Sequence, residues 1–199
     1  MILVLSATSP LVSVALLDTA QGTVVAAAEK ESPRAASGTA IGLIDALFAE
    51  TGRHGRDIGA IVADVGPGSF TGVKVSVTLA KTLAYSLRVP VAGVAAFDLV
   101  SPDRVVAIGG KPGHWFVRTP GCEPECRSGA FPSGAVGYGP GVEDPVFPAA
   151  LRAGALAADL DYGEPARLQP LYVAEPNISA PKVPYRRVPD ASPRDGGNG

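Results

Sequence analysis

The segment VGPGSFTGVK, residues 65–74, decides the fold because it joins an apolar, strand-like run to a long helical pattern. Gly66 and Gly68 permit backbone angles that residues with side chains resist, while Pro67 stiffens the turn. The run before the segment is typical of a buried strand, and the apolar residues after it recur with helical spacing. The segment therefore predicts a strand–turn–helix unit within an α/β fold.

The turn itself has two interpretations, a structural turn and a nucleotide contact. Ser69 or Thr71 can cap the following helix, whose first amide groups point outward as a mild anion site. The spacing excludes a Walker phosphate loop, because Lys74 follows Gly72 by two residues and Val75 replaces the hydroxyl residue that would hold magnesium. A backbone contact to nucleotide stays open for the turn residues Gly66, Pro67, Gly68, Ser69, Phe70, Thr71 and Gly72.

Outward from this unit, the first hundred residues form a regular series of short elements. Apolar, β-rich runs with short connections predict an antiparallel meander, and later strand–helix crossovers complete a mixed sheet with helices packed against it. We assign residues 1–100 to a first lobe with the order β-β-β-α-β-α-β-α. The expected strands are Ile2–Leu5, Leu11–Leu17, Thr23–Ala28, Ile58–Val65 and Val91–Val94, and the expected helices are Thr39–Glu50, Gly72–Leu87 and Ala96–Val100.

The second half is less regular, because glycine and proline recur from Pro120 to Pro148. We assign residues 101–175 to a second, reduced α/β lobe. Residues 176–199 are proline-rich with a glycine-rich end, which predicts a disordered tail that cannot bury enough apolar surface. The expected elements of the second lobe are strands Val105–Ile108, Trp115–Arg118, Ala135–Tyr138 and Leu168–Val173, and an alanine-rich helix Ala149–Leu160.

The two expected helices at Thr39–Glu50 and Gly72–Leu87 are apolar over more than the one side that would pack on a sheet. In the second of them, the basic residues Lys74, Lys81 and Arg88 stand seven residues apart on a thin solvated line. A helix that is apolar on two sides is either buried in its own core or shared with a partner. We expect an interface with another protein, formed by Ile41, Ile44, Leu47, Phe48, Val73, Val77, Leu79, Leu83 and Leu87.

Composition and charge exclude several classes of protein. The formal net charge is −2, from 17 basic and 19 acidic residues, so no broad positive field supports tight, unaided binding of nucleic acid. No apolar run approaches the roughly 20 residues that span a bilayer. We therefore expect a cytoplasmic protein without membrane contact that does not bind DNA or RNA tightly by itself.

No catalytic or metal site is expected from the pattern of reactive residues. The cysteines Cys122 and Cys126 and the histidines His54 and His114 are too few and too far apart for a zinc site. General acid–base chemistry needs a carboxylate or histidine beside the reacting group, and only Asp64, just before the turn, is well placed. A single carboxylate is more often structural, so the chain is expected to hold no metal or cofactor by itself.

Several of these segments together resemble the TsaB (YeaZ) family. The resemblance covers residues 1 to about 176, and its turn-and-helix signature is highly specific. The segments that carry it are GPGSFTGVKVSVTLAKTLAYSL at 66–87, VPVAGV at 89–94, ILVL at 2–5, SVAL at 13–16, GYG at 137–139 and LQPLYV at 168–173.

The resemblance implies an actin-like ATPase fold (ASKHA, ribonuclease H-like) with two lobes, the second one reduced. It implies a non-catalytic subunit of the bacterial machinery that forms N6-threonylcarbamoyladenosine at position 37 of tRNA. Members of the family pair with the catalytic subunit TsaD through their amino-terminal helices, and the ATPase TsaE joins the assembly. ATP or ADP and a metal ion are then expected only in the assembled complex.

Two further hypotheses remain beside this one. A nucleotide-binding or ATP-hydrolysing enzyme of the same fold, acting alone, needs a carboxylate that holds magnesium. The family usually has Asp-Thr-Ser after the first strand, where this chain has Ser6, Ala7 and Thr8, so that aspartate is absent. Alternatively, the free chain forms a homodimer through the same apolar helices.

Overall fold

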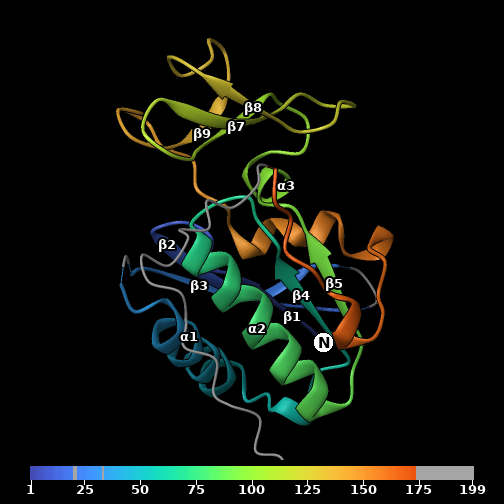
Figure 1. Ribbon diagram of the computed structural model, residues 1–199. Helices are drawn as coiled ribbons and strands as arrows, with labels where there is room; N and C mark the ends of the chain where they lie inside the picture. Colours follow the sequence, from blue (N-terminus) through green and yellow to red (C-terminus); the bar gives the residue numbers. More distant parts are fainter. Residues whose placement is uncertain (20–21, 33, 174–199) are drawn as a thin grey trace, which may run out of the picture.

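Two sheets organise the part of the chain that the computed structural model describes, residues 1–19, 22–32 and 34–173 (Figure 1). Within these residues the first sheet has five strands in the order β3-β2-β1-β4-β5. Strand β1 pairs antiparallel with β2 and parallel with β4, which matches the predicted meander followed by crossovers. The strands are β1 Ile2–Ser6, β2 Leu11–Leu17, β3 Val24–Glu31, β4 Ala60–Asp64 and β5 Val91–Val94.

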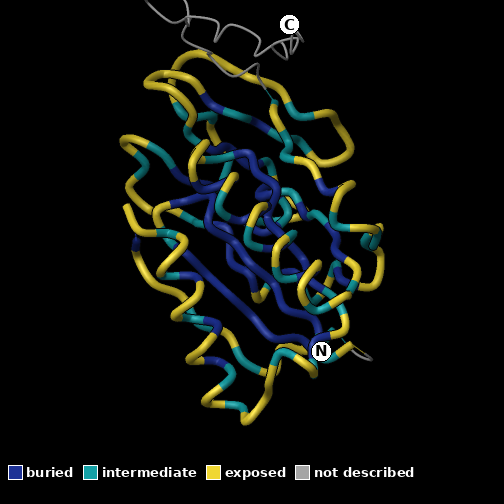
Figure 2. Tube along the Cα trace, turned by 60° about the horizontal axis from the view of Figure 1, so that its bottom comes forward, coloured by how far each residue is buried: buried dark blue, intermediate teal, exposed yellow. Residues whose placement is uncertain are grey.

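The central strands are apolar on both faces because both faces of the sheet are covered. All five residues of β1 are buried, and Figure 2 shows buried segments concentrated in the middle of the molecule. Strands covered on two sides read as continuous apolar runs rather than as alternating ones. The edge strand β3 is mostly exposed, in keeping with its charged end Glu29, Lys30 and Glu31.

Helices α1 (Ala36–Thr51) and α2 (Phe70–Leu87) cover one face of the first sheet. Ile44 and Leu47 from α1 and Val73 and Val77 from α2 lie in one core cluster with Leu3 and other inward side chains of the strands. The chain's own sheet therefore covers the inner sides of both helices. Between the two helices, a 3-10 turn at Gly55–Asp57 leads into β4.

The opposite face is covered by α3 (Ala96–Val100) and by 3-10 segments at Ala150–Ala155 and Ala157–Asp159. The predicted α-helix Ala149–Leu160 is therefore wrong, since alanine content is a weak preference that tertiary packing overrides. Here the backbones of Gly154 and Gly22 approach so closely that a side chain on either residue would clash with the other's carbonyl oxygen. The Ser13 hydroxyl also accepts a hydrogen bond from the amide of Ala150 at 2.8 Å.

The second lobe is a smaller sheet of strand order β8-β7-β6-β9 within the described residues. Its strands are β6 Val106–Gly109, β7 His114–Arg118, β8 Glu125–Ser128 and β9 Val136–Tyr138. Strand β8 was not expected, because all four of its residues are exposed and show no apolar alternation. It is held by backbone pairing with β7 instead.

After the second sheet the chain returns to the first lobe. Residues 150–159 pack on the first sheet, Gly163 pairs with Val91, and a last 3-10 turn at Pro165–Arg167 contacts α2. The first lobe thus contains two separate stretches of sequence, residues 1–100 and the segment after residue 149. The prediction assigned that later segment to the second lobe. The predicted tail, residues 176–199, lies outside the described residues.

The expected strand Leu168–Val173 is an irregular segment. Leu171 donates one backbone hydrogen bond to Val65 at 2.8 Å, as a strand residue would. Pro170, its neighbour, has no amide hydrogen to extend the pairing. The segment nevertheless passes close to the turn at residues 66–68, because a side chain on Gly66 would meet the Leu171 carbonyl oxygen.

Candidate functional site

The turn between β4 and α2 is packed against the turn between β1 and β2. The amide of Ser69 donates a 2.7 Å hydrogen bond to the Thr8 carbonyl oxygen. A side chain on Gly68 would clash with that same oxygen, and one on Gly72 would clash with the carbonyl oxygen of Ala7. Glycine is required at both positions by this close approach of two backbones. A structural role for the turn is therefore established by its contacts.

The start of α2 shows how its cap is arranged. The Ser69 hydroxyl accepts a hydrogen bond from the amide of Gly72 at 3.3 Å, so Ser69 and not Thr71 is the N-cap. Gly66 has φ of +95°, a left-handed conformation that glycine adopts without strain, and its peptide bond to Pro67 is cis. The sequence thus identified the turn correctly as a glycine-dependent joint.

Asp64 lies beneath this joint and is completely buried. Its Oδ2 accepts hydrogen bonds from the hydroxyls of Ser6 at 2.7 Å and Thr8 at 2.5 Å, and its Oδ1 accepts one from the amide of Gly66 at 2.9 Å. Burial raises the pKa of the Asp64 carboxyl to about 6, although the three hydrogen bonds act in the opposite direction. Both carboxylate oxygens are thus occupied by the protein's own donors, which suits a structural acid.

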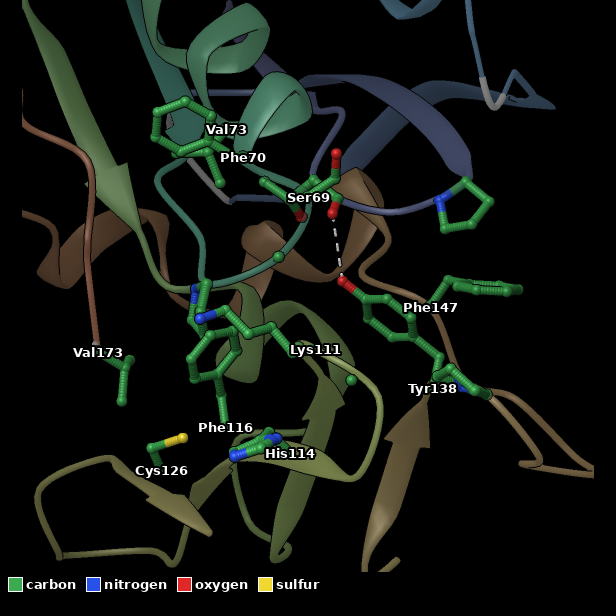
Figure 3. Close-up of a pocket in the computed structure, with 18 of the residues that line it drawn as sticks. Ser69, Phe70, Val73, Lys111, His114, Phe116, Cys126, Tyr138, Phe147 and Val173 are labelled. Carbon is green, nitrogen blue, oxygen red and sulfur yellow. Dashed lines mark hydrogen bonds between the residues drawn. The ribbon is translucent and has the colours of Figure 1, made fainter. Parts of the chain in front are cut away.

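A cavity of about 1020 Å³ opens between the two lobes above this cluster (Figure 3). Its first wall is formed by the two packed turns, with Thr8 and Pro10 from one and Pro67, Gly68, Ser69 and Phe70 from the other. The other three residues of the predicted turn, Gly66, Thr71 and Gly72, do not line it. The structure therefore brings only part of the predicted nucleotide contact to the cavity surface.

The second wall comes from the small sheet and was missed in the sequence. His114 and Phe116 alternate with the inward Trp115 and Val117 along β7, and Cys126 lies opposite Phe116 on β8. Lys111 extends from the β6–β7 turn, and Tyr138 and Phe147 close the far side (Figure 3). The sequence predicts a strand here, but its run of three apolar residues, Trp115 to Val117, does not show which face lines a cavity. That depends on how the lobes pack.

Tyr138 connects the two walls. Its hydroxyl donates a 3.3 Å hydrogen bond to the carbonyl oxygen of Thr8, and its ring lies 5.1 Å from the ring of Phe147. Burial, and secondarily the charge of Asp64, raises the pKa of the Tyr138 phenol, so this hydroxyl stays protonated. Gly139, beside it, lies so close to Trp115 that any side chain there would clash with the indole ring.

The residues predicted to form a partner interface differ in burial and fall into three groups. Ile44, Leu47, Val73 and Val77 are buried in the core, so the prediction that they form an outer surface is wrong; the sheet beneath α1 and α2 covers them. Ile41 is 49% exposed. The four remaining residues, which are partly buried at the core's margin, are Phe48, Leu79, Leu83 and Leu87.

Neither cysteine forms a disulfide, and both thiols are exposed. Cys126 is part of strand β8, whereas Cys122 lies in the loop before it. No group of three or more histidine, cysteine, aspartate or glutamate side chains that could hold a metal ion occurs among the described residues. In the same part of the chain, no helix is both long enough and apolar enough to cross a membrane.

Comparison with known proteins gives one family match and one close local match in sequence. The family described as "TsaD: tRNA N6-adenosine threonylcarbamoyltransferase" matches residues 25–101. The Bacillus subtilis (strain 168) protein named "tRNA threonylcarbamoyladenosine biosynthesis protein TsaB" is 46% identical over 48 residues, 24% of this chain. That match spans about a fifth, 21%, of the B. subtilis protein.

Solved structures match over a much larger part of the chain. A Pseudomonas aeruginosa protein, described as uncharacterized with similarity to peptidase YEAZ, superposes with a TM-score of 0.71 at 21% identity, covering 87% of this chain and 99% of its own. YeaZ from the same organism gives a TM-score of 0.66 at 22% identity, with 86% and 98% covered. The predicted actin-like α/β fold is confirmed by these neighbours.

Proposed function

We propose that this chain is a member of the TsaB (YeaZ) family and acts in the formation of N6-threonylcarbamoyladenosine at position 37 of tRNA. The local match to a B. subtilis TsaB protein supports this proposal, and the fold shared with YeaZ agrees with it. Its role there is that of a non-catalytic, cytoplasmic subunit that pairs with a TsaD-like catalytic subunit. A TsaE-like ATPase joins the assembly, and tRNA is contacted mainly through the partners.

The exposed apolar side chains on α1 and α2 are the observation that supports this pairing. The two helices lie side by side on the outer face of the first lobe (Figure 1). Ile41 projects from α1 with half of its surface in solvent, and Tyr85 projects from α2 with 81% exposed. Leu79, Leu83 and Leu87 add a partly covered row along α2. Exposed apolar groups along adjacent helices are the usual material of a helix-to-helix interface.

The non-catalytic role is supported by the environment of Asp64. A magnesium-binding carboxylate must present free oxygens to the cavity, whereas those of Asp64 are buried and hydrogen-bonded to Ser6, Thr8 and Gly66. Ser6 occupies the position at which the family usually has an aspartate, and it serves as a donor to Asp64. The arrangement is suited to holding the two turns together.

The pairing is tested by co-expressing the full chain with a TsaD-like subunit and measuring co-elution by size-exclusion chromatography. Ile41→Glu places a charge on the proposed surface and is expected to abolish co-elution, because a desolvated, unpaired charge opposes association. The matched control is Leu151→Glu, since Leu151 is similarly exposed (45% against 49%) but lies on the 3-10 segment of the opposite face. This control should still co-elute.

The possible results separate the parts of the proposal. Co-elution that survives Ile41→Glu contradicts the docking surface, and absence of co-elution for the unmodified chain contradicts the partner. In a reconstituted system, the modified nucleoside should be absent from tRNA when this chain is omitted. Its formation by this chain alone would contradict the non-catalytic role.

A lone ATP-hydrolysing enzyme is the second candidate, favoured by the size of the cavity between the lobes. It predicts magnesium-dependent ATP binding to the isolated chain. Calorimetry with ATP, in magnesium and then in EDTA, distinguishes this candidate from a docking subunit.

A further inference from the structure

We propose that the cavity between the lobes binds a small planar aromatic or heteroaromatic molecule that carries an anionic group, and that it does so without a divalent metal ion. The cavity lies at the lobe junction and includes only the first turn of α2, whereas the proposed docking residues Ile41 and Tyr85 do not line it. This inference is therefore independent of the proposed pairing, and either can fail without the other.

The aromatic side chains of the cavity select a planar ring. Phe116 projects from β7 into the cavity, and the Tyr138–Phe147 pair faces the cavity from the far side (Figure 3). At the mouth, the exposed rings of Phe70 and Tyr172 lie 6.2 Å apart. A cavity of this volume, lined mainly by apolar and aromatic groups with a few polar ones, is the common form of a small-molecule site. Ring faces and edges favour a second aromatic system.

The charges around the cavity select an anion. Lys111 is a full positive charge on its lining, and Figure 3 shows its side chain extending over Phe116 towards the first lobe. His114 contributes an imidazole on the same wall, and its Nδ1 lies 3.1 Å from the Pro112 carbonyl oxygen. None of the described residues that line the cavity is an aspartate or a glutamate. Both Lys111 and His114 are exposed at the cavity edge, so they attract an anion to the mouth of the cavity as partly solvated groups.

The glycines at the β6–β7 turn let the ligand approach the backbone. Gly109 packs against Gly139, and Gly110 packs against the edge of Phe116, so that larger residues would push into the cavity walls. Gly109, Gly110 and Gly139 all line the cavity. The polar end of a ligand near Lys111 therefore lies beside exposed peptide groups.

The donor set does not suit magnesium. Magnesium requires oxygen ligands in near-octahedral geometry, commonly including a carboxylate. Asp64, the buried carboxylate under the first wall, already accepts three hydrogen bonds from Ser6, Thr8 and Gly66. Binding through Lys111 and the aromatic walls needs no metal bridge. This separates the proposed site from one that recognises a magnesium–nucleotide complex.

The test uses the two cysteines of the full-length chain as reporters. Cys126 lines the cavity, whereas Cys122 is exposed and does not line it. The rate of N-ethylmaleimide modification at each cysteine is followed by peptide mass spectrometry, and calorimetry measures affinity in parallel. The probes, all in EDTA, are adenosine monophosphate, indole-3-acetate, neutral adenosine and inorganic phosphate.

We expect one or both aromatic anions to slow modification of Cys126 and leave Cys122 unchanged. Adenosine monophosphate and indole-3-acetate distinguish a nucleotide from an aromatic carboxylate as the source of the same chemistry. Adenosine has the ring but no anionic group, and phosphate has the anionic group but no ring. Each should bind at least about tenfold more weakly than the aromatic anions, because one charge-assisted contact or the ring is lost. Added magnesium should not strengthen binding.

Two variants make the test specific. Lys111→Met is expected to weaken the aromatic anion by about tenfold with no effect on adenosine. The matched control is Lys30→Met on β3, an exposed lysine outside the cavity, which should bind like the unmodified chain. The proposal is overturned if neither aromatic anion protects Cys126 or binds in calorimetry. It is also overturned if Lys111→Met binds normally or if binding requires magnesium.

Discussion

The hydroxyl of Thr8 donates a hydrogen bond of 2.5 Å to Oδ2 of Asp64, and this contact joins the turn after β1 to the end of β4. The carbonyl oxygen of the same threonine accepts hydrogen bonds from the amide of Ser69 and the hydroxyl of Tyr138. Thr8 therefore connects both sheets and the start of α2 at one point. These contacts of Thr8 support the first wall of the cavity, so the first predictions concern the stability of the protein at this point.

Asp64→Asn should remove a pH dependence of stability. Because the pKa of Asp64 is raised to about 6 in the folded chain, the folded state binds a proton more tightly than the unfolded one. The contribution of this residue to stability is fully present below pH 4 and is lost as the pH rises through 6. Relative to the unmodified chain, Asp64→Asn should therefore gain roughly 2–3 kcal/mol between pH 4 and pH 7.

Urea denaturation followed by circular dichroism, at several pH values for both proteins, measures this difference. Asp98 does not affect the comparison, because burial raises its pKa in both proteins alike. A constant difference between the two proteins across this pH range would contradict the proposed environment of Asp64.

Gly72→Ala should destabilise the chain, whereas the same change at Gly42 should stabilise it. Both glycines lie within α-helices, where alanine normally stabilises by about 0.5–1 kcal/mol. At Gly42 no atom lies within 4 Å of the added methyl group, but at Gly72 the methyl group would clash with the carbonyl of Ala7. We expect a loss of about 1–3 kcal/mol or more for Gly72→Ala. Thermal unfolding of the two variants measures the difference in stability. The same change in stability for both variants would contradict the close contact between Gly72 and Ala7.

Leu47→Ala should distinguish core from surface among the apolar residues of α1. Leu47 has no exposed surface, so its truncation leaves a cavity and should cost about 2–5 kcal/mol. Ile41, on the same helix and half exposed, should lose less than about 1 kcal/mol when changed to alanine. Chemical denaturation of both variants measures these values. A small effect at Leu47 would return that residue to the candidate interface.

The first lobe could be predicted well from sequence because its elements are regular and its turns are short. Strand β5 and helix α3 have the predicted bounds, and β2 does as well. Helix α1 begins at Ala36 rather than Thr39, which fits the absence of a side-chain cap at its start. Local pattern determined these elements, since each carries its own apolar period and turn residues.

The burial of helix sides could not be predicted by counting apolar residues. Val77 and Leu83 both belong to α2, yet Val77 is 5% exposed and Leu83 is only partly covered. The difference arises from the path of β1 and β4 beneath the helix, which the sequence of α2 does not contain. Likewise, Lys111 and Cys126 became cavity residues only through the pairing of β6, β7 and β8 and the placement of that sheet against the first lobe.

The return of residues 150–168 to the first sheet affects how the protein matures on the ribosome. The face formed by Val4, Ala15 and Val62 is covered by Ala150 and Ala153, which emerge only after the entire small sheet has been translated. Until then, the nascent amino-terminal half has this side of its sheet covered only in part, by α3, and the rest is exposed to chaperones and to aggregation. A fragment ending near residue 100 would remain permanently in that unfinished condition.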